Sequence, residues 1–150
     1  GFWIAREALR HVWRNEDEEP GRWNASRLSR AVLAHIGSDD WAASREFIYN
    51  NERGEVGKLA LAVAAQAEHD PVAADILARA GDELGRHARA LIARHGKRPV
   101  VLAGRASMLH PSILQSMRAA LPGDIVLTHA PAQAHVGAAR IAASLLTSTP

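Results

Sequence analysis

Apolar residues recur every three to four positions between Pro71 and Gly96, and this spacing predicts one long amphipathic helix. Residues at this spacing lie on one face, so we expect them to pack against a sheet or a neighbouring helix. Pro71 suits the first helical turn because its missing N–H is not needed there, and Gly96 suits a left-handed C-cap. The predicted inner face consists of Val72, Ile76, Ala80, Leu84, Ala88 and Leu91.

A short apolar run follows this helix. Residues Pro99 to Ala103 are too few and too β-branched for a helix, and their unbroken apolarity predicts a parallel strand covered on both faces. Gly104 ends the strand. In open α/β sheets ligands bind beyond the carboxyl ends of strands, where a glycine lets the backbone approach a nucleotide closely. The same arrangement is also the ordinary junction of any α/β unit, so the pattern alone favours plain architecture.

Helical patterns also fill the chain before Asp70. The first helix carries apolar positions from Ile4 to Trp13, and the acidic run 15–19 is expected to end it as a solvated loop before Pro20. Another helix is expected over about Glu52 to His69. Its inward-facing residues are Val56, Leu59, Val63 and Ala67.

Capping residues mark two more helices between these. Asn24 or Ser26 can cap a helix that ends at Gly37. Asp39 or Asp40 can cap the next one, which contains Trp41, Phe47 and Ile48.

The last third of the chain continues the α/β alternation. Pro111 opens a helix, residues Ile125 to Thr128 form a second apolar strand, and a final helix begins near Ala132. The two strands are expected to be parallel neighbours. Two short strands do not complete a sheet, so we expect further strands from chain that precedes Gly1.

Composition narrows the class of protein. The 150 residues are enough for one domain with a sizeable core, and the absence of cysteine excludes disulfides and cysteine nucleophiles within the chain. The sequence has no charged leader with a cleavage site and no apolar run of membrane-spanning length. We therefore expect a cytoplasmic protein without a membrane partner.

The charge pattern argues against a nucleic-acid partner. The net charge is only +2, and Asp75 with Arg79 and Asp82 with Arg86 have the i,i+4 spacing of exposed helical ion pairs. No aromatic residue is placed to stack bases among the remaining basic residues. These are Arg86, Arg89, Arg94, Lys97 and Arg98.

Neither a metal site nor a serine hydrolase is indicated. The eight histidines are scattered, with no HExxH pattern and no paired acidic ligands. No Gly-x-Ser-x-Gly elbow is present, and Ser107 has no evident base near it in the sequence.

Three segments occur in a familiar order: GFWIAREALR at 1–10, ARAGDELGRHARALI at 78–92 and VVLAGRAS at 100–107. Together they resemble the N-acetylglucosamine kinase family, within the BadF/BadG-type ATPases of the actin and hexokinase superfamily. The resemblance implies an α/β fold, namely the helix-rich C-terminal lobe of a ribonuclease H-like ATPase, with two short parallel strands. Residues 1–150 would then be a single partial domain of a two-lobe sugar kinase.

The resemblance also implies a reaction. Such kinases transfer the γ-phosphoryl group of ATP, with Mg²⁺, to a sugar hydroxyl. The acceptor implied here is N-acetylglucosamine, with glucosamine as the nearest rival. A non-catalytic ligand-sensing or nucleotide-gated module is the alternative from another class.

No catalytic residue is assigned within this chain. In the family the aspartate base and the Gly-rich phosphate turn belong to the N-terminal lobe, and no Asp-Gly-Gly-Gly turn occurs here. Asp17, Asp39 and Asp40 are rejected as substitutes because they lie in polar loops or at expected helix caps. This fragment alone is expected to be inactive.

Nucleotide contact is the role that the resemblance carries over. Gly104 matches the glycine of the family's adenosine-binding loop, and Ala103 and Ser107 flank it. Arg105 stands where the family often has glycine or serine, so its side chain would either block close approach or stack on adenine. Val56 and Gly57 match positions that wall the adenine, although helix packing explains them as well.

Related kinases often pair through this lobe. A homodimer is therefore another expectation, with Trp13, Trp23 and Trp41 as candidate surface residues.

Overall fold

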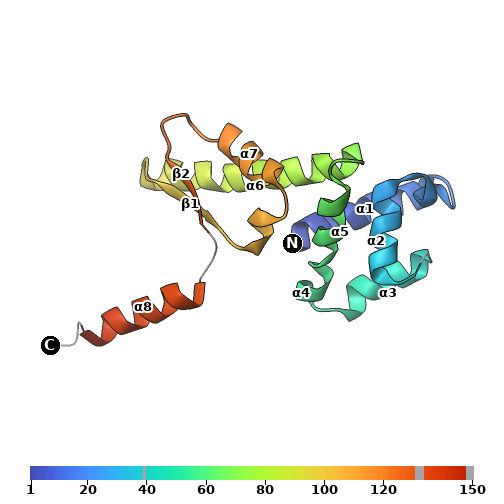
Figure 1. Cartoon of the computed structure of the whole chain (residues 1–150), viewed down its shortest axis with the longest axis horizontal. Helices are drawn as coiled ribbons and strands as arrows, with labels where there is room; N and C mark the ends of the chain where they lie inside the picture. Colours follow the sequence, from blue (N-terminus) through green and yellow to red (C-terminus); the bar gives the residue numbers. More distant parts are fainter. Residues whose placement is uncertain (39, 131–133, 148–150) are drawn as a thin grey trace.

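The computed structural model describes residues 1–38, 40–130 and 134–147, and it is helix-rich with two short parallel strands (Figure 1). This is an α/β arrangement, as predicted. The elements in chain order are α1 (Phe2–Glu18), η1 (Arg22–Ala25), α2 (Arg27–Ile36), α3 (Trp41–Asn50), α4 (Arg53–Val56), α5 (Leu59–Gln66), α6 (Pro71–His95), β1 (Val100–Ala103), η2 (Arg105–Met108), α7 (Pro111–Ala119), β2 (Leu127–Ala130) and α8 (Ala134–Thr147).

The larger hydrophobic core joins α1, α2, α5 and the first half of α6. Two predicted caps are confirmed here: Ser26 accepts from Ser29 N, and Asp40 accepts from Ala42 N. Asp70 caps α6 in the same way, by accepting from Val72 N, although its capping role was not predicted. Asp39 lies outside the described residues. The expected inward residues of the region 52–69 are buried, namely Val56, Leu59, Val63 and Ala67.

The prediction of a single helix over 52–69 is wrong, because the chain forms two helices, α4 and α5, separated at Gly57 and Lys58. Gly54 and Gly57 lower the helix propensity of this stretch. The start of α1 also passes close by, since a Cβ on Gly57 would lie 3.3 Å from Phe2 N. The break therefore makes room for the first residues of the chain.

The tryptophans proposed for a dimer surface are all partly buried, and two of them pack on this core. Trp13 and Trp23 pack against it, and Trp13 Nε1 donates to Ser44 Oγ at 2.8 Å. Their apolar rings are thus largely satisfied inside this chain.

Two expectations about charged residues need correction. The acidic run is not a loop: α1 continues to Glu18, whose carboxylate binds Arg22 Nη1 at 2.7 Å. Asp75 pairs with Arg79 at 2.8 Å as predicted, but Arg86 binds Glu83 at 2.7 Å instead of Asp82. An i,i+3 partner also lies on the same helix face, which sequence spacing alone does not separate from i,i+4.

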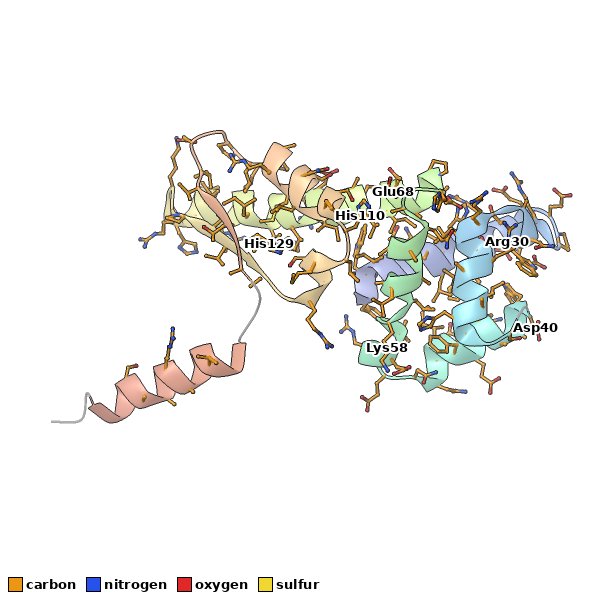
Figure 2. The ribbon with its side chains drawn as sticks, in the orientation of Figure 1. Arg30, Asp40, Lys58, Glu68, His110 and His129 are labelled. Atoms are coloured by element: carbon orange, nitrogen blue, oxygen red, sulfur yellow. The ribbon has the colours of Figure 1, made fainter. Side chains whose placement is uncertain are left out.

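Helix α7 lies along α6 over a stripe of small residues (Figure 1). A Cβ on Gly81 would lie 2.3 Å from Ile113 O, and one on Gly85 would lie 2.5 Å from the Ala120 Cβ. The two helix backbones approach this closely because these positions lack side chains. His110 caps α7, and its Nε2 lies 3.0 Å from Glu68 Oε1 before α6 (Figure 2).

The strands pair in parallel as predicted, with Val100 opposite Leu127 and Ala103 opposite Ala130. The second strand begins two residues later than expected. Ile125 is buried, and its N–H closes a turn onto Pro122 O, so residues 122–125 form the turn. Pairing starts where the Val100 N–H donates to Val126 O at 2.8 Å.

The expectation that the first strand is covered on both faces is wrong for this structure. Leu102 is 5% exposed beneath α6 and α7, whereas Val101, on the opposite face, is 61% exposed. Leu91, predicted to face inward, is 58% exposed because the buried stripe of α6 drifts to Ala88 and Ile92 at this end. Gly96 has a φ of 77° but a ψ of 172°, so the chain leaves α6 extended instead of in a left-handed turn.

Helix α8 follows β2 and is drawn apart from the other helices (Figure 1). Its expected start at Ala132 lies outside the described residues. Among the described helices, none combines the length and apolarity needed to cross a membrane.

Candidate functional site

A cavity of about 250 Å³ opens at the carboxyl end of β1. Its walls come from the start of α1, the middle of α6 and the turn that follows β1. Most of the lining is apolar and includes Trp3, Ile4, Leu84, Leu102, Ala106 and Ile113. A concave, mainly apolar site at the carboxyl end of a parallel strand is the usual place for a ligand in an α/β fold.

Gly104 connects β1 to this cavity. Its φ of 109° and ψ of 150° are conformations that residues with a Cβ rarely adopt, so glycine is required here. No atom lies within 4 Å of the position that a Cβ would occupy. The requirement thus comes from the backbone, and the space beside Gly104 is open to a ligand.

Ser107 is the buried polar residue of the turn, at 6% exposed. Its Oγ lies 2.6 Å from Gly104 O and 2.9 Å from His129 Nε2. Sequence reasoning found no base for Ser107 and missed His129, which lies 22 positions away in the sequence. The available signal was its place near the end of the second strand, since parallel strands bring their carboxyl ends to one edge.

The hydroxyl geometry decides what this pair can do. A carbonyl oxygen only accepts, so the single Ser107 proton is donated to Gly104 O. With this proton on Gly104 O, the contact at 2.9 Å requires the His129 tautomer that carries a proton on Nε2 and donates it to Ser107 Oγ. A histidine in this state does not accept the serine proton, and the pair is an ordering contact, not a nucleophile with its base.

Polar groups from α6 complete the rim. Glu83 and His87 line the cavity beside Trp3. The hydrogen bond from Arg86 lowers the pKa of Glu83, so this carboxylate stays ionised. Sequence reasoning missed both residues, because a solvated helix face explains them equally well. The site therefore combines apolar walls with a polar rim whose carboxylate is paired with Arg86, which suits binding of an apolar ring that carries polar edges.

The structure brings some of the predicted nucleotide residues together. Ala103 and Ser107 line the cavity, and Gly104 and Arg105 belong to the same turn. Gly57 lies beside the cavity residue Gly1, where a Cβ on Gly1 would lie 2.8 Å from Gly57 O. Val56 is fully buried in the larger core.

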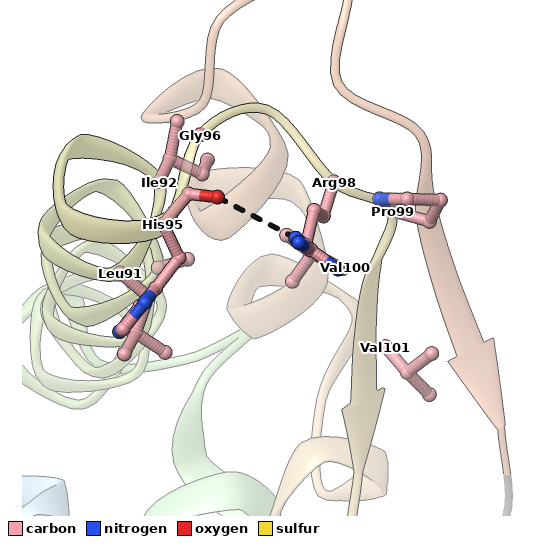
Figure 3. Close-up of a pocket in the computed structure, with 9 residues that line it drawn as sticks. Leu91, Ile92, His95, Gly96, Arg98, Pro99, Val100 and Val101 are labelled. Atoms are coloured by element: carbon pink, nitrogen blue, oxygen red, sulfur yellow. Dashed lines mark hydrogen bonds between the residues drawn. The ribbon is translucent and has the colours of Figure 1, made fainter.

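A second hollow, of about 510 Å³, lies between the end of α6 and β1 (Figure 3). Leu91, Ile92, Val100 and Val101 form much of it, and Arg98 Nε donates to His95 O at 3.4 Å. It opens away from the carboxyl ends of the strands. Because ligands of α/β sheets usually bind at the carboxyl ends of the strands, the smaller cavity is the better candidate site.

Within the described part of the chain, no group of three or more histidine or acidic side chains could hold a metal ion. Comparison of the chain with protein-family models, curated proteins and solved structures gives no match.

Proposed function

We propose that this chain is the C-terminal, nucleotide-binding lobe of a cytoplasmic ATP-dependent amino-sugar kinase that phosphorylates N-acetylglucosamine. One observation carries the proposal: the turn at Gly104 leaves β1 in a conformation that requires glycine and borders a cavity at the strand's carboxyl end. The resemblance of VVLAGRAS at 100–107 to the family's adenosine loop supplies the identity of the ligand.

The residues of this chain support nucleotide binding more than they support catalysis of phosphoryl transfer. The apolar walls, with the Trp3 indole, suit a purine ring, and the open side of Gly104 lets a nucleotide approach the backbone. Arg105 is exposed beside this turn and is free to lie against the base. The proposal gives this lobe no catalytic base.

A requirement for Mg²⁺ is compatible with a lobe that binds the nucleotide but holds no catalytic base. Mg²⁺ is commonly held by one or two carboxylates together with substrate phosphates and water, and so needs no complete cage in this lobe. When bound, it neutralises charge on the transferred phosphoryl group. The proposal assigns no Mg²⁺ ligand to this lobe.

Gly104→Val is expected to raise the KM for ATP about tenfold while leaving the KM for the sugar unchanged. Valine strains the backbone at φ 109°, so the turn must shift away from its nucleotide-binding shape. Steady-state kinetics of the full-length two-lobe protein, which the proposal expects to contain this lobe, measure this change. Gly21→Val is the matched control, because Gly21 has a φ of 84°, open space around it and a position remote from the cavity. An unchanged KM for ATP in a well-folded Gly104→Val protein contradicts the nucleotide role.

The substrate is tested by assaying the full-length two-lobe protein with Mg-ATP and either N-acetylglucosamine or glucosamine. Preference for N-acetylglucosamine supports the proposal, and preference for glucosamine changes the acceptor alone. Absence of turnover with both sugars, in protein that still binds ATP, favours the ligand-sensing module. The ordering role of the Ser107 and His129 contact, which provides no nucleophile, is consistent with such a module.

A further inference from the structure

A chain of hydrogen bonds joins the carboxyl end of β2 to the turn that follows β1. It runs from His129 Nε2 to Ser107 Oγ and on to Gly104 O, over 2.9 Å and 2.6 Å. The Ser107 N–H also donates to Gly104 O, at 3.2 Å. The turn therefore closes on one buried serine, and that serine is held from the neighbouring strand.

The strand register explains how His129 reaches the turn. His129 pairs with Leu102, and paired residues of a parallel sheet present their side chains to the same face. On that face Leu102 is buried beneath α6 and α7, and η2 contacts α7, whereas His129, nearer the sheet edge, is exposed. Figure 2 labels His129 near the end of β2, beside this turn.

The turn, which also packs against α7, gains order from such a contact because its own backbone hydrogen bonds are few and long. It consists of a single short 3₁₀ turn, whose hydrogen-bond geometry is weaker than that of an α-helix. It begins at a glycine, which loses more conformational freedom on ordering than any other residue. A donor fixed on a neighbouring strand lowers the number of conformations open to this segment.

We propose that His129 is a positioning residue for the nucleotide turn, acting through Ser107 as an Nε2–H donor. It touches neither ATP nor the sugar. It holds residues 104–107 in the shape that lines the cavity, so that the turn is ordered before the nucleotide arrives. This role rests on the proposed function for its effect on ATP, whereas the ordering of the turn is independent of it.

Three variants distinguish the effect of the hydrogen-bond donor of His129 from the effect of the size of its side chain. His129→Phe keeps a ring of similar size and removes the donor. His129→Gln restores an N–H donor at about the reach of Nε2. Ser107→Ala removes the acceptor, so the double variant with His129→Phe tests whether the two residues act as one unit.

Amide hydrogen exchange of the complete chain without nucleotide is the first readout. We expect exchange at 104–107 to be about fivefold faster in His129→Phe and Ser107→Ala, the effect of one lost hydrogen bond, and near wild type in His129→Gln. The double variant should resemble each single variant. The ¹⁵N shifts of His129 should show a protonated Nε2 and an unprotonated Nδ1 at a pH where the ring is neutral.

Kinetics are the second readout. The KM for ATP should rise about fivefold in His129→Phe, with kcat and the KM for the sugar unchanged. A general loss of stability would not raise the KM for ATP alone. His129→Gln should restore the wild-type KM for ATP.

The results that overturn the inference are distinct. Exchange at 104–107 that is as slow in His129→Phe as in wild type shows that the donor does not order the turn. Faster exchange with an unchanged KM for ATP shows that the turn does not position the nucleotide. If the wild type fails to bind ATP, the proposed function and the effect on ATP fail together, and exchange still decides the ordering of the turn.

Discussion

Gly81→Ala is expected to destabilise the protein by about 3 kcal/mol, although alanine is the better helix former. The added Cβ would lie 2.3 Å from Ile113 O and 2.8 Å from the Ser116 Cβ. The first of these atoms belongs to the backbone of α7, so it cannot move away without moving the helix. Urea unfolding followed by circular dichroism measures the loss of stability.

Gly54→Ala is the matched control for this substitution. Gly54 is also helical, but no atom lies within 4 Å of its Cβ position. Without a clash, alanine should be neutral or stabilise the protein by up to about 1 kcal/mol. Equal stability of Gly81→Ala and wild type would show that α6 and α7 do not pack at this distance in solution.

Asp70→Ala is expected to cost about 3 kcal/mol, because one carboxylate holds the starts of two helices. Its Oδ1 accepts from Val72 N at 2.9 Å and its Oδ2 from Leu28 N at 2.8 Å. Removing it leaves the buried Leu28 N–H without its partner. Asp70→Asn keeps an acceptor and should cost about half as much.

The same carboxylate predicts a pH dependence. Burial raises the pKa of Asp70, but the hydrogen bonds from Leu28, Val72, Ala73 and Ser26 outweigh burial and lower the pKa below 3.8. A carboxyl whose pKa is lowered by folding contributes stability that is complete above its unfolded value. That contribution is lost as the pH falls from about 3.8 through the folded pKa. The stability difference between wild type and Asp70→Asn should therefore shrink below pH 4, and a constant difference would contradict this role.

Local signals in the sequence predicted the helices and strands better than they predicted the contacts between distant segments. Pro71, Ser26 and Asp70 act within a few residues of themselves, so the helix starts they mark could be placed correctly. The parallel pairing also followed from the order of helix and strand. These features depend on short stretches of chain and little on the rest of the molecule.

The errors arise where distant segments decide the structure. The break at Gly57 depends on the passage of Phe2, and the late start of β2 depends on burial of Ile125 in the smaller core. The donor to Ser107 comes from another strand, and only its place directly after the predicted second strand distinguishes His129 from the other seven histidines. The candidate turn was thus visible in the sequence, whereas the residue that orders it was not.

Helix α6 belongs to both hydrophobic clusters at once. Its 25 residues span about 37 Å, with Ile76 and Leu77 in the larger cluster and Ala88 in the smaller one. Leu84 packs against both and also lines the cavity. A ligand seated in the cavity would therefore contact, through the single side chain of Leu84, the point where the two hydrophobic clusters meet.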